Sequence, residues 1–150
     1  LKDKEVLIVG GGTLSCRKAQ TIKEYEAHIT VYSEKLTEKK LNEIKDIKFI
    51  SENLKNDDET IEKLVKQYFL VIAATDNNEL NDRIACVCMK NNILINNVSS
   101  KTEMNAMFGG IVKNDEFHVA VSTNGKNCKR SKSLKTRIQE LLNEIESSRE

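Results

Sequence analysis

VLIVGGGTLS, residues 6–15, decides the fold of this chain. Four apolar residues run into three glycines and an amphipathic pattern follows, which predicts a strand, a tight turn and the start of a helix. Gly10 and Gly12 match the first two glycines of the dinucleotide-binding fingerprint, while Ser15 stands at the third place, where Gly or Ala normally allows close packing of helix and strand. The turn is expected to bind the pyrophosphate of a dinucleotide; a glycine turn in another α/β fold is the alternative.

Strands and helices alternate outward from this turn. Strands are expected at residues 5–9, 27–32, 47–51, 68–74 and 93–96, and helices from the turn to about residue 25 and at 34–45, 58–67 and 78–91. The alternation predicts an α/β fold with a doubly wound parallel sheet of the Rossmann type. Ligands of such a sheet bind at the carboxyl ends of its strands.

The pattern changes after residue 97. An antiparallel strand pair is expected at 109–112 and 116–122 around a turn at 113–115, and a last helix follows from about residue 128. This helix carries an apolar stripe with no obvious partner inside a small Rossmann core, made of Leu134, Ile138, Leu141, Leu142 and Ile145. The chain therefore divides into a nucleotide-binding domain, residues 1–97, and a region at residues 98–150 whose stripe suggests a second chain as partner.

Composition excludes several classes of function. The 150 residues include 24 basic and 23 acidic side chains, and a net charge of +1 gives no reason to expect nucleic acid as a partner. The longest apolar run, residues 69–74, is far too short to span a membrane. Four scattered cysteines are expected to be reduced, and with no leader before the first strand the sequence favours a cytoplasmic protein. The chain is expected to be trimmed at both ends.

Polar residues follow the predicted strands where a nucleotide would lie. Glu34, just beyond the second strand, either accepts hydrogen bonds from the adenosine ribose or is a solvated carboxylate at a helix start. No Arg stands beside it to hold a 2′-phosphate, which favours NAD over NADP. Thr75 and Asp76 place a hydroxyl and a carboxylate after the fourth sheet strand, where Asp76 or Asn77 is also expected to cap the next helix.

Several blocks of the chain occur together in one known family. They are Val9-Gly10-Gly11-Gly12, Arg17-Lys18, Ala73-Ala74-Thr75-Asp76 with Leu80-Asn81, Asn97-Val98, Phe108 and Ser122-Thr123-Asn124-Gly125-Lys126. In order and spacing the chain resembles the precorrin-2 dehydrogenase and sirohydrochlorin ferrochelatase family, which forms the amino-terminal module of siroheme synthase. The resemblance implies an enzyme that uses NAD to remove a hydride and a proton from precorrin-2, giving sirohydrochlorin in siroheme and cobalamin biosynthesis. It also implies a homodimer, with residues 98–150 forming the dimerisation region and substrate cleft.

The resemblance also assigns residues to the cofactor and to the substrate. The nucleotide contacts would be Gly10, Gly11, Gly12, Thr13 and Leu14 at the turn, Ser33, Glu34 and Lys35 after the second strand, and Thr75 and Asp76 after the fourth. Thr123 and Asn124 would line the substrate cleft; a strand end with a helix cap is the alternative for their block. A basic stripe either holds substrate carboxylates or is a solvated face, and consists of Lys126, Lys129, Arg130 and Arg137.

One departure from the family touches the chemistry. Family members read Asn-Val-x-Asp-Asp-Pro, with the first Asp proposed to serve dehydrogenation and chelation, and this chain reads Asn97-Val98-Ser99-Ser100-Lys101-Thr102. The Asn96-Asn97 pair allows two registers that differ by one residue, which place Ser99 or Ser100 at the Asp position, and neither register has an Asp there. Ser99 is taken as the candidate at this position. A serine hydroxyl is a poor base at neutral pH, so Ser99 can hydrogen-bond the tetrapyrrole but does not simply replace a carboxylate. Ferrochelatase activity is therefore disfavoured, and no metal site is predicted because His28 and His118 are each isolated.

Three hypotheses for the function remain open. The first is an NAD-dependent precorrin-2 dehydrogenase, because hydride transfer belongs largely to the cofactor and the protein mainly positions the reactive carbon. The second is a catalytically impaired, dimeric member of the family that binds NAD or a tetrapyrrole and delivers intermediates to, or regulates, another enzyme of the pathway. The third is an unrelated redox enzyme of the Rossmann type.

Overall fold

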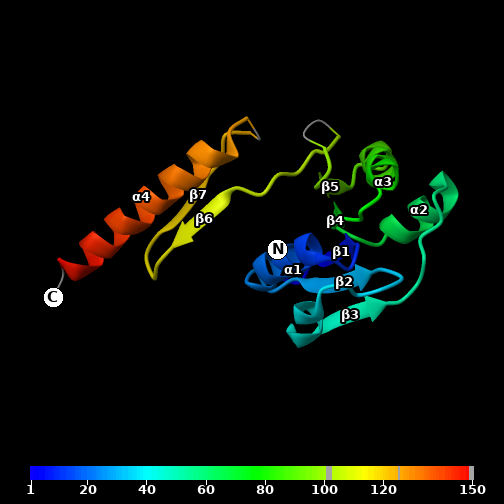
Figure 1. Cartoon of the computed structure of the whole chain (residues 1–150), viewed down its shortest axis with the longest axis horizontal. Coiled ribbons are helices and arrows are strands. Elements are labelled where there is room, and N and C mark those ends of the chain that lie inside the picture. Colours follow the sequence, from blue (N-terminus) through cyan, green and yellow to red (C-terminus); the bar gives the residue numbers. More distant parts are fainter. Residues whose placement is uncertain (101–102, 125, 149–150) are drawn as a thin grey trace. The chain divides into compact units, whose positions relative to one another are not determined.

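The computed structural model describes residues 1–100, 103–124 and 126–148 and divides the chain into two compact units (Figure 1). The first unit is Leu1–Ala106 and the second is Met107–Glu150. The first contains a parallel sheet and the second an antiparallel strand pair with a long helix. The predicted fold class is therefore confirmed.

The sheet of the first unit has five strands among the described residues. They are β1 (Glu5–Val9), β2 (His28–Tyr32), β3 (Ile47–Ile50), β4 (Leu70–Ala73) and β5 (Leu94–Asn97), and they lie in the order β3-β2-β1-β4-β5 with every pair parallel. The register pairs Val9 with Tyr32 on one side and with Ala73 on the other. The carboxyl ends of β2, β1 and β4 therefore meet at one edge of the sheet.

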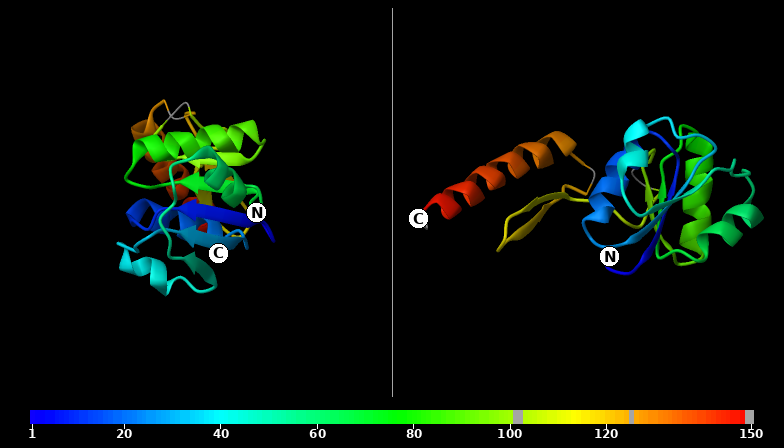
Figure 2. Two further views of the ribbon diagram at one scale, coloured as in Figure 1. Left: turned by 90° about the vertical axis from the view of Figure 1, so that its right-hand side faces the viewer. Right: turned by 90° about the horizontal axis from the view of Figure 1, so that it is seen from below.

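Helices cover both faces of this sheet (Figure 2). One face carries α1 (Thr13–Lys23) and the 3-10 helix η1 (Lys39–Glu43), and the other carries α2 (Asp58–Val65) and α3 (Asn78–Lys90). The four residues of β4 are all buried, as expected for a strand covered on both sides. None of the helices in the described ranges is long and apolar enough to cross a membrane.

The helix predicted at residues 34–45 is wrong, because only η1 forms there. The segment before η1 bonds instead to the glycine turn, since the backbone N–H groups of Thr37 and Glu38 both donate to the Gly11 carbonyl, at 2.9 and 3.1 Å. Ser33 Oγ also donates to the Lys35 carbonyl at 2.8 Å. These bonds fall outside the pattern of an α-helix, whose N–H groups donate to carbonyls four residues earlier.

The second unit is a hairpin covered by one helix. The strands β6 (Gly110–Lys113) and β7 (His118–Val121) are antiparallel, and α4 (Cys128–Ser147) packs against β6. Val112, Val121 and Leu142 are its buried apolar residues. The rest of the predicted stripe is covered only in part: Ile138 is half-buried, whereas Leu134 and Leu141 are 50% and 53% exposed.

The two units separate after Ala106, whereas the sequence interpretation divides the chain after residue 97. The segment between these points returns to β5. The backbone N–H groups of Asn105 and Ala106 donate to the Ile95 carbonyl at 3.2 and 3.0 Å, and Asn105 Oδ1 accepts from the Ile95 N–H at 2.7 Å. These bonds attach the segment after β5 to the first unit.

Asp57 caps α2 and makes the stability of the fold depend on pH. Its carboxylate accepts from the Thr60 N–H at 2.8 Å and from Thr60 Oγ1 at 2.9 Å, and these bonds lower the pKa of Asp57. A carboxyl with a lowered pKa stabilises the fold above its unfolded-state pKa of about 3.9 and loses that contribution as pH falls through the folded-state pKa. We expect Asp57→Asn, which keeps a capping oxygen but does not titrate, to be less sensitive to acid than the parent in urea unfolding.

Asp58→Asn is the matched control for this measurement. Asp58 lies one residue further along, in the first turn of α2 rather than at its cap. This variant should keep the acid sensitivity of the parent. An equal loss of stability on acidification in the parent and in Asp57→Asn would contradict the role assigned to the cap.

Candidate nucleotide-binding site

The glycine turn connects β1 to α1 and presents the start of that helix. Gly10 has a φ of +124°, and a Cβ there would lie 2.7 Å from the Ala74 carbonyl carbon and closer still to its oxygen. Gly12 is the N-cap of α1 and brings no capping side chain, and the nearest atom to a Cβ built on it is Thr37 Oγ1 at 3.7 Å. Backbone N–H groups at such a helix start, together with the helix dipole, bind phosphate. The turn has the chemistry that a pyrophosphate needs.

Gly11 supports the turn from the side of β2. Its carbonyl accepts from the backbone N–H groups of Thr37 and Glu38 and also from Thr37 Oγ1, at 3.2 Å. A Cβ on Gly11 would lie 2.9 Å from Ser33 Oγ and closer still to the Lys35 carbonyl oxygen. The three glycines therefore differ in role, and Gly11 is required by the loop after β2.

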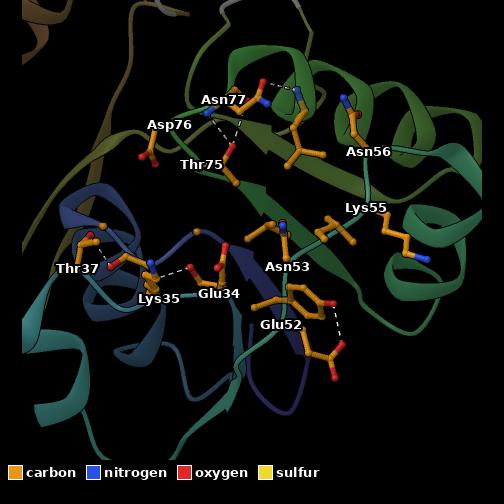
Figure 3. Close-up of a pocket in the computed structure, with 18 residues that line it drawn as sticks. Glu34, Lys35, Thr37, Glu52, Asn53, Lys55, Asn56, Thr75, Asp76 and Asn77 are labelled. Atoms are coloured by element: carbon orange, nitrogen blue, oxygen red, sulfur yellow. Dashed lines mark hydrogen bonds between the residues drawn. The ribbon is translucent and has the colours of Figure 1, made fainter.

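A cavity of about 780 Å³ opens beside the turn (Figure 3). Its walls come from the turn, the loop after β2, the segment after β3 and the end of β4. Thr13 and Leu14 begin α1 outside this lining, where Thr13 Oγ1 donates to Glu38 Oε2 at 3.3 Å. The structure brings the other predicted cofactor residues together in the lining, namely Gly10, Gly11, Gly12, Ser33, Glu34, Lys35, Thr75 and Asp76.

The segment after β3 forms a wall of the cavity that residue patterns did not predict. Glu52 accepts from Tyr32 Oη at 2.9 Å, and burial together with this carboxylate raises the pKa of Tyr32 to about 12. Ser51 Oγ donates to the Glu34 carbonyl at 3.2 Å and ties this wall to the loop after β2. Only the strand order could have predicted this wall. Because β3 lies next to β2 and runs parallel to it, the carboxyl end of β3 reaches the same edge of the sheet.

Asn77 and Asn81 organise the end of β4. Asn77 rather than Asp76 caps α3, because its Oδ1 accepts from the Leu80 N–H at 3.1 Å. The Thr75 N–H donates to Asn81 Oδ1 at 3.1 Å, and Thr75 Oγ1 donates to the same atom at 2.7 Å. Thr75 is therefore held from α3 while it lines the cavity.

Ser99 lies just beyond β5 and is exposed. Its Oγ accepts from Asn81 Nδ2 at 2.6 Å, and its backbone N–H donates to Asn97 Oδ1 at 2.9 Å. The sequence places Asn81 in the Leu80-Asn81 block shared with the family and predicts no role for it. Asn81 contacts both Thr75 and Ser99 because β4 and β5 are neighbours in the sheet, and the local residue pattern does not reveal this strand order.

Thr123 and Asn124 belong to the second unit, in the turn between β7 and α4. Thr123 Oγ1 accepts from the Asn127 N–H at 2.9 Å, and Asn124 has a φ of 50°. Gly125 of the same block lies outside the described residues. Because α4 begins only at Cys128, Lys126 precedes the helix and does not extend the basic stripe of that helix.

The described residues contain three free thiols and no cluster of metal-binding side chains. Cys16, Cys86 and Cys88 are free thiols, and the side chain of Cys128 is outside the described part. Over the same residues, no three His, Cys, Asp or Glu side chains gather where they could hold a metal ion.

Comparison with known proteins gives one family and several relatives. Residues 1–110 match the family described as "Putative NAD(P)-binding". The chain is 31% identical over 144 residues to a siroheme synthase of Baumannia cicadellinicola subsp. Homalodisca coagulata, in an alignment that covers 95% of this chain and 30% of that protein. It is 28% identical over 149 residues to the siroheme biosynthesis protein met8 of Schizosaccharomyces pombe, with 93% and 53% covered.

A solved structure shares the fold over most of the chain. The structure titled "SirC, precorrin-2 dehydrogenase" superposes with a TM-score of 0.77 at 24% identity, covering 93% of this chain and 67% of the other. The chain spans about 30% of the length of the siroheme synthases it matches. The similarity therefore includes most of this chain, both the parallel sheet and the strand pair with its helix. It includes only one part of the longer siroheme synthases.

Proposed function

We propose, because the chain belongs to this NAD(P)-binding family, that it catalyses the NAD-dependent dehydrogenation of precorrin-2 to sirohydrochlorin, a step of siroheme and cobalamin biosynthesis. The observation that carries the proposal is the cavity, where the glycine turn, Ser33 to Lys35 and Thr75 with Asp76 meet at one sheet edge. The names of the relatives, siroheme synthase, siroheme biosynthesis protein and precorrin-2 dehydrogenase, favour a tetrapyrrole as the substrate.

The residues of the cavity fit a dinucleotide. A Cβ at Gly12 would meet only Thr37 Oγ1, at 3.7 Å, so the backbone N–H groups at the amino end of α1 are accessible and would hold the pyrophosphate. Bound NAD supplies the hydride acceptor, so that precorrin-2 and NAD give sirohydrochlorin, NADH and one proton. Thr75 and Asp76 present polar groups at the cavity, and Ser99 would hydrogen-bond the tetrapyrrole. The proton leaves to water or to a carboxylate of the substrate.

Glu34 favours NAD over NADP. Its side chain is exposed and lines the cavity just after β2, where a carboxylate accepts hydrogen bonds from the adenosine ribose hydroxyls. The same negative charge would repel the 2′-phosphate of NADP. We therefore expect turnover with NAD to exceed turnover with NADP.

The second candidate function is supported by Ser99. A hydroxyl stands where an Asp is proposed to act in the family, which favours a member that binds NAD or a tetrapyrrole without converting it. Incubating the chain with precorrin-2 and NAD while recording the absorption spectrum separates the two functions, because sirohydrochlorin has its own spectrum. NAD-dependent formation of that spectrum supports the dehydrogenase; no change above a blank overturns it and leaves the binding protein.

We propose a cytoplasmic site of action on the basis of the thiols. Cys86 is exposed and free, which is the state that a reducing compartment maintains.

The chain is proposed to form a homodimer through α4. Leu134, Ile138, Leu141 and Ile145 follow one another at intervals of four, three and four residues, the spacing of a coiled-coil seam. Basic residues fill the first half of α4 and acidic residues the second, so that its first turn holds no acid and its last turn no base. The helix dipole favours acidic residues at the start of a helix and basic residues at its end, so this charge distribution is unfavourable in a single α4. In a second copy running antiparallel, the acidic half of one α4 would lie beside the basic half of the other.

An antiparallel pair of α4 helices would place Arg137 opposite Glu144 of the second copy. We expect the parent to sediment as a dimer at micromolar concentration, and Arg137→Glu and Glu144→Arg each to weaken it severalfold. The double variant should recover the affinity of the parent, because it restores opposite charges. Lys132→Glu, on the side of the helix away from the seam, should change nothing. A monomeric parent, or a double variant weaker than either single one, would contradict this arrangement.

A further inference from the structure

Asn81 is a fully buried polar side chain that connects three segments of the first unit. It lies on α3 and has 0% of its surface exposed. Its Oδ1 accepts from the Thr75 N–H and Thr75 Oγ1, and its Nδ2 donates to the Thr75 carbonyl at 2.9 Å and to Ser99 Oγ at 2.6 Å. A carboxamide has two N–H donors and one oxygen with two lone pairs, so all four positions are used.

The orientation of this carboxamide is fixed by the backbone of Thr75. The Thr75 N–H can only donate and the Thr75 carbonyl can only accept, so Asn81 must present Oδ1 to the first and Nδ2 to the second. If the carboxamide were rotated by half a turn, its Nδ2 donor would face the Thr75 N–H donor and its Oδ1 acceptor would face the Thr75 carbonyl. Buried polar groups without a hydrogen-bond partner destabilise the fold. The second proton of Nδ2 is therefore directed at Ser99.

This orientation decides what Ser99 can do. Because Ser99 Oγ accepts from Asn81, its own proton is turned away from Asn81 and is left for another acceptor. Ser99 is exposed, and its backbone is held by Asn97, whose side chain is 1% exposed and donates to Asp82 Oδ1 at 2.7 Å. The hydroxyl is therefore held in place as a hydrogen-bond donor toward the outside of the first unit.

We propose that Asn81 is a positioning residue that links the nucleotide site to the substrate side, holding Thr75 at the cavity and presenting Ser99 as a hydrogen-bond donor to an acceptor group of the substrate. The part concerning the substrate rests on the proposed function. A tetrapyrrole with carboxylate side chains offers such acceptors. Ser99 then binds and orients the substrate, and the proton released in the reaction goes elsewhere.

Asn81→Asp tests the proposal with little change in shape. It keeps the acceptor for Thr75 but replaces both donors by an oxygen, so that Ser99 must turn and donate to residue 81. We expect kcat with precorrin-2 to fall roughly tenfold in the parent background and by a clearly smaller factor in a Ser99→Ala background, where only the loss of the donor to the Thr75 carbonyl remains. A purely structural role predicts the same loss in both backgrounds. Asn78→Asp, on the exposed first turn of α3, is the matched control and should keep parental kinetics.

A second measurement does not need activity or an altered Asn81. In ¹⁵N-labelled protein, Ser99→Ala should shift the Nδ2 proton resonances of Asn81 while the Kd for NAD stays within about twofold of the parent. Unchanged resonances would overturn the proposal, whether or not the chain converts precorrin-2. Losses of kcat that multiply in the double variant would also overturn it. A parent that is inactive while the resonances shift would overturn the proposed function and leave the contact between Asn81 and Ser99 supported.

Discussion

Gly12→Ala is expected to fold like the parent and to bind NAD about 100-fold more weakly, which corresponds to about 2.7 kcal/mol. A Cβ at this position meets no atom of the chain closer than 3.7 Å, and the φ of −97° is open to alanine. The same space is where a pyrophosphate must approach the backbone at the start of α1. The variant therefore separates the binding role of the turn from its structural role, and fluorescence titration with NAD beside urea unfolding measures both.

Gly10→Ala is the contrasting variant for this experiment. Its Cβ would collide with the Ala74 carbonyl, and its φ of +124° is one that alanine rarely adopts. Both stability and NAD binding should therefore fall. Parental affinity for NAD in a well-folded Gly12→Ala would mean that the nucleotide does not lie on this turn.

Ser99→Asp is expected to raise kcat with precorrin-2 by about 10- to 100-fold, because a positioned general base typically contributes about 10²- to 10⁴-fold. Its KM should rise, because the carboxylate no longer donates to an acceptor group of the substrate. Asn81 Nδ2 lies 2.6 Å from Ser99 Oγ and can donate equally to a carboxylate there. The variant restores the acid that the family is proposed to use, and steady-state formation of sirohydrochlorin measures the gain. Its affinity for NAD should stay close to that of the parent, since Ser99 does not line the cavity.

Ser100→Asp tests the other register of the family motif, in which Ser100 rather than Ser99 stands at the Asp position. Its carboxylate would stand one residue further along the chain, beyond the residue that Asn81 contacts. No gain is expected from it, because Asn81 donates to Ser99; a gain from Ser100→Asp alone would place the acid position at Ser100. An equal gain from both variants would attribute the effect to negative charge in general, and no gain from Ser99→Asp would remove this position from the chemistry.

The sheet and the turn could be predicted because local chemistry dictates them. The apolar run of β1, the glycines and the alternation of strands and helices each constrain the backbone directly, and β4 is buried on both faces as its apolar sequence requires. The division of the chain is less local. Asn105 and Ala106 bond back to β5 and so stay with the first unit, although the sequence pattern changes earlier.

The parts of the site that could not be predicted depend on contacts distant in sequence. Residues 34–38 have a charged, helix-like composition, yet two of their backbone N–H groups donate to Gly11 and prevent a helix there. Glu52 reaches the cavity only because β3 lies beside β2. Asn81 acquires its place from the adjacency of β4 and β5, which brings Thr75 and Ser99 to the same side chain. Strand order therefore supplies the information that the residue pattern lacks.

We propose that this chain transfers a hydride from precorrin-2 to NAD. The most direct test of this claim follows NADH and sirohydrochlorin together in one reaction that contains purified protein, precorrin-2 and NAD. We expect one NADH for each sirohydrochlorin formed, with both products absent when NAD is left out and both greatly slowed in Gly12→Ala. Sirohydrochlorin that forms without NADH, or neither product above the protein-free rate, would contradict the claim.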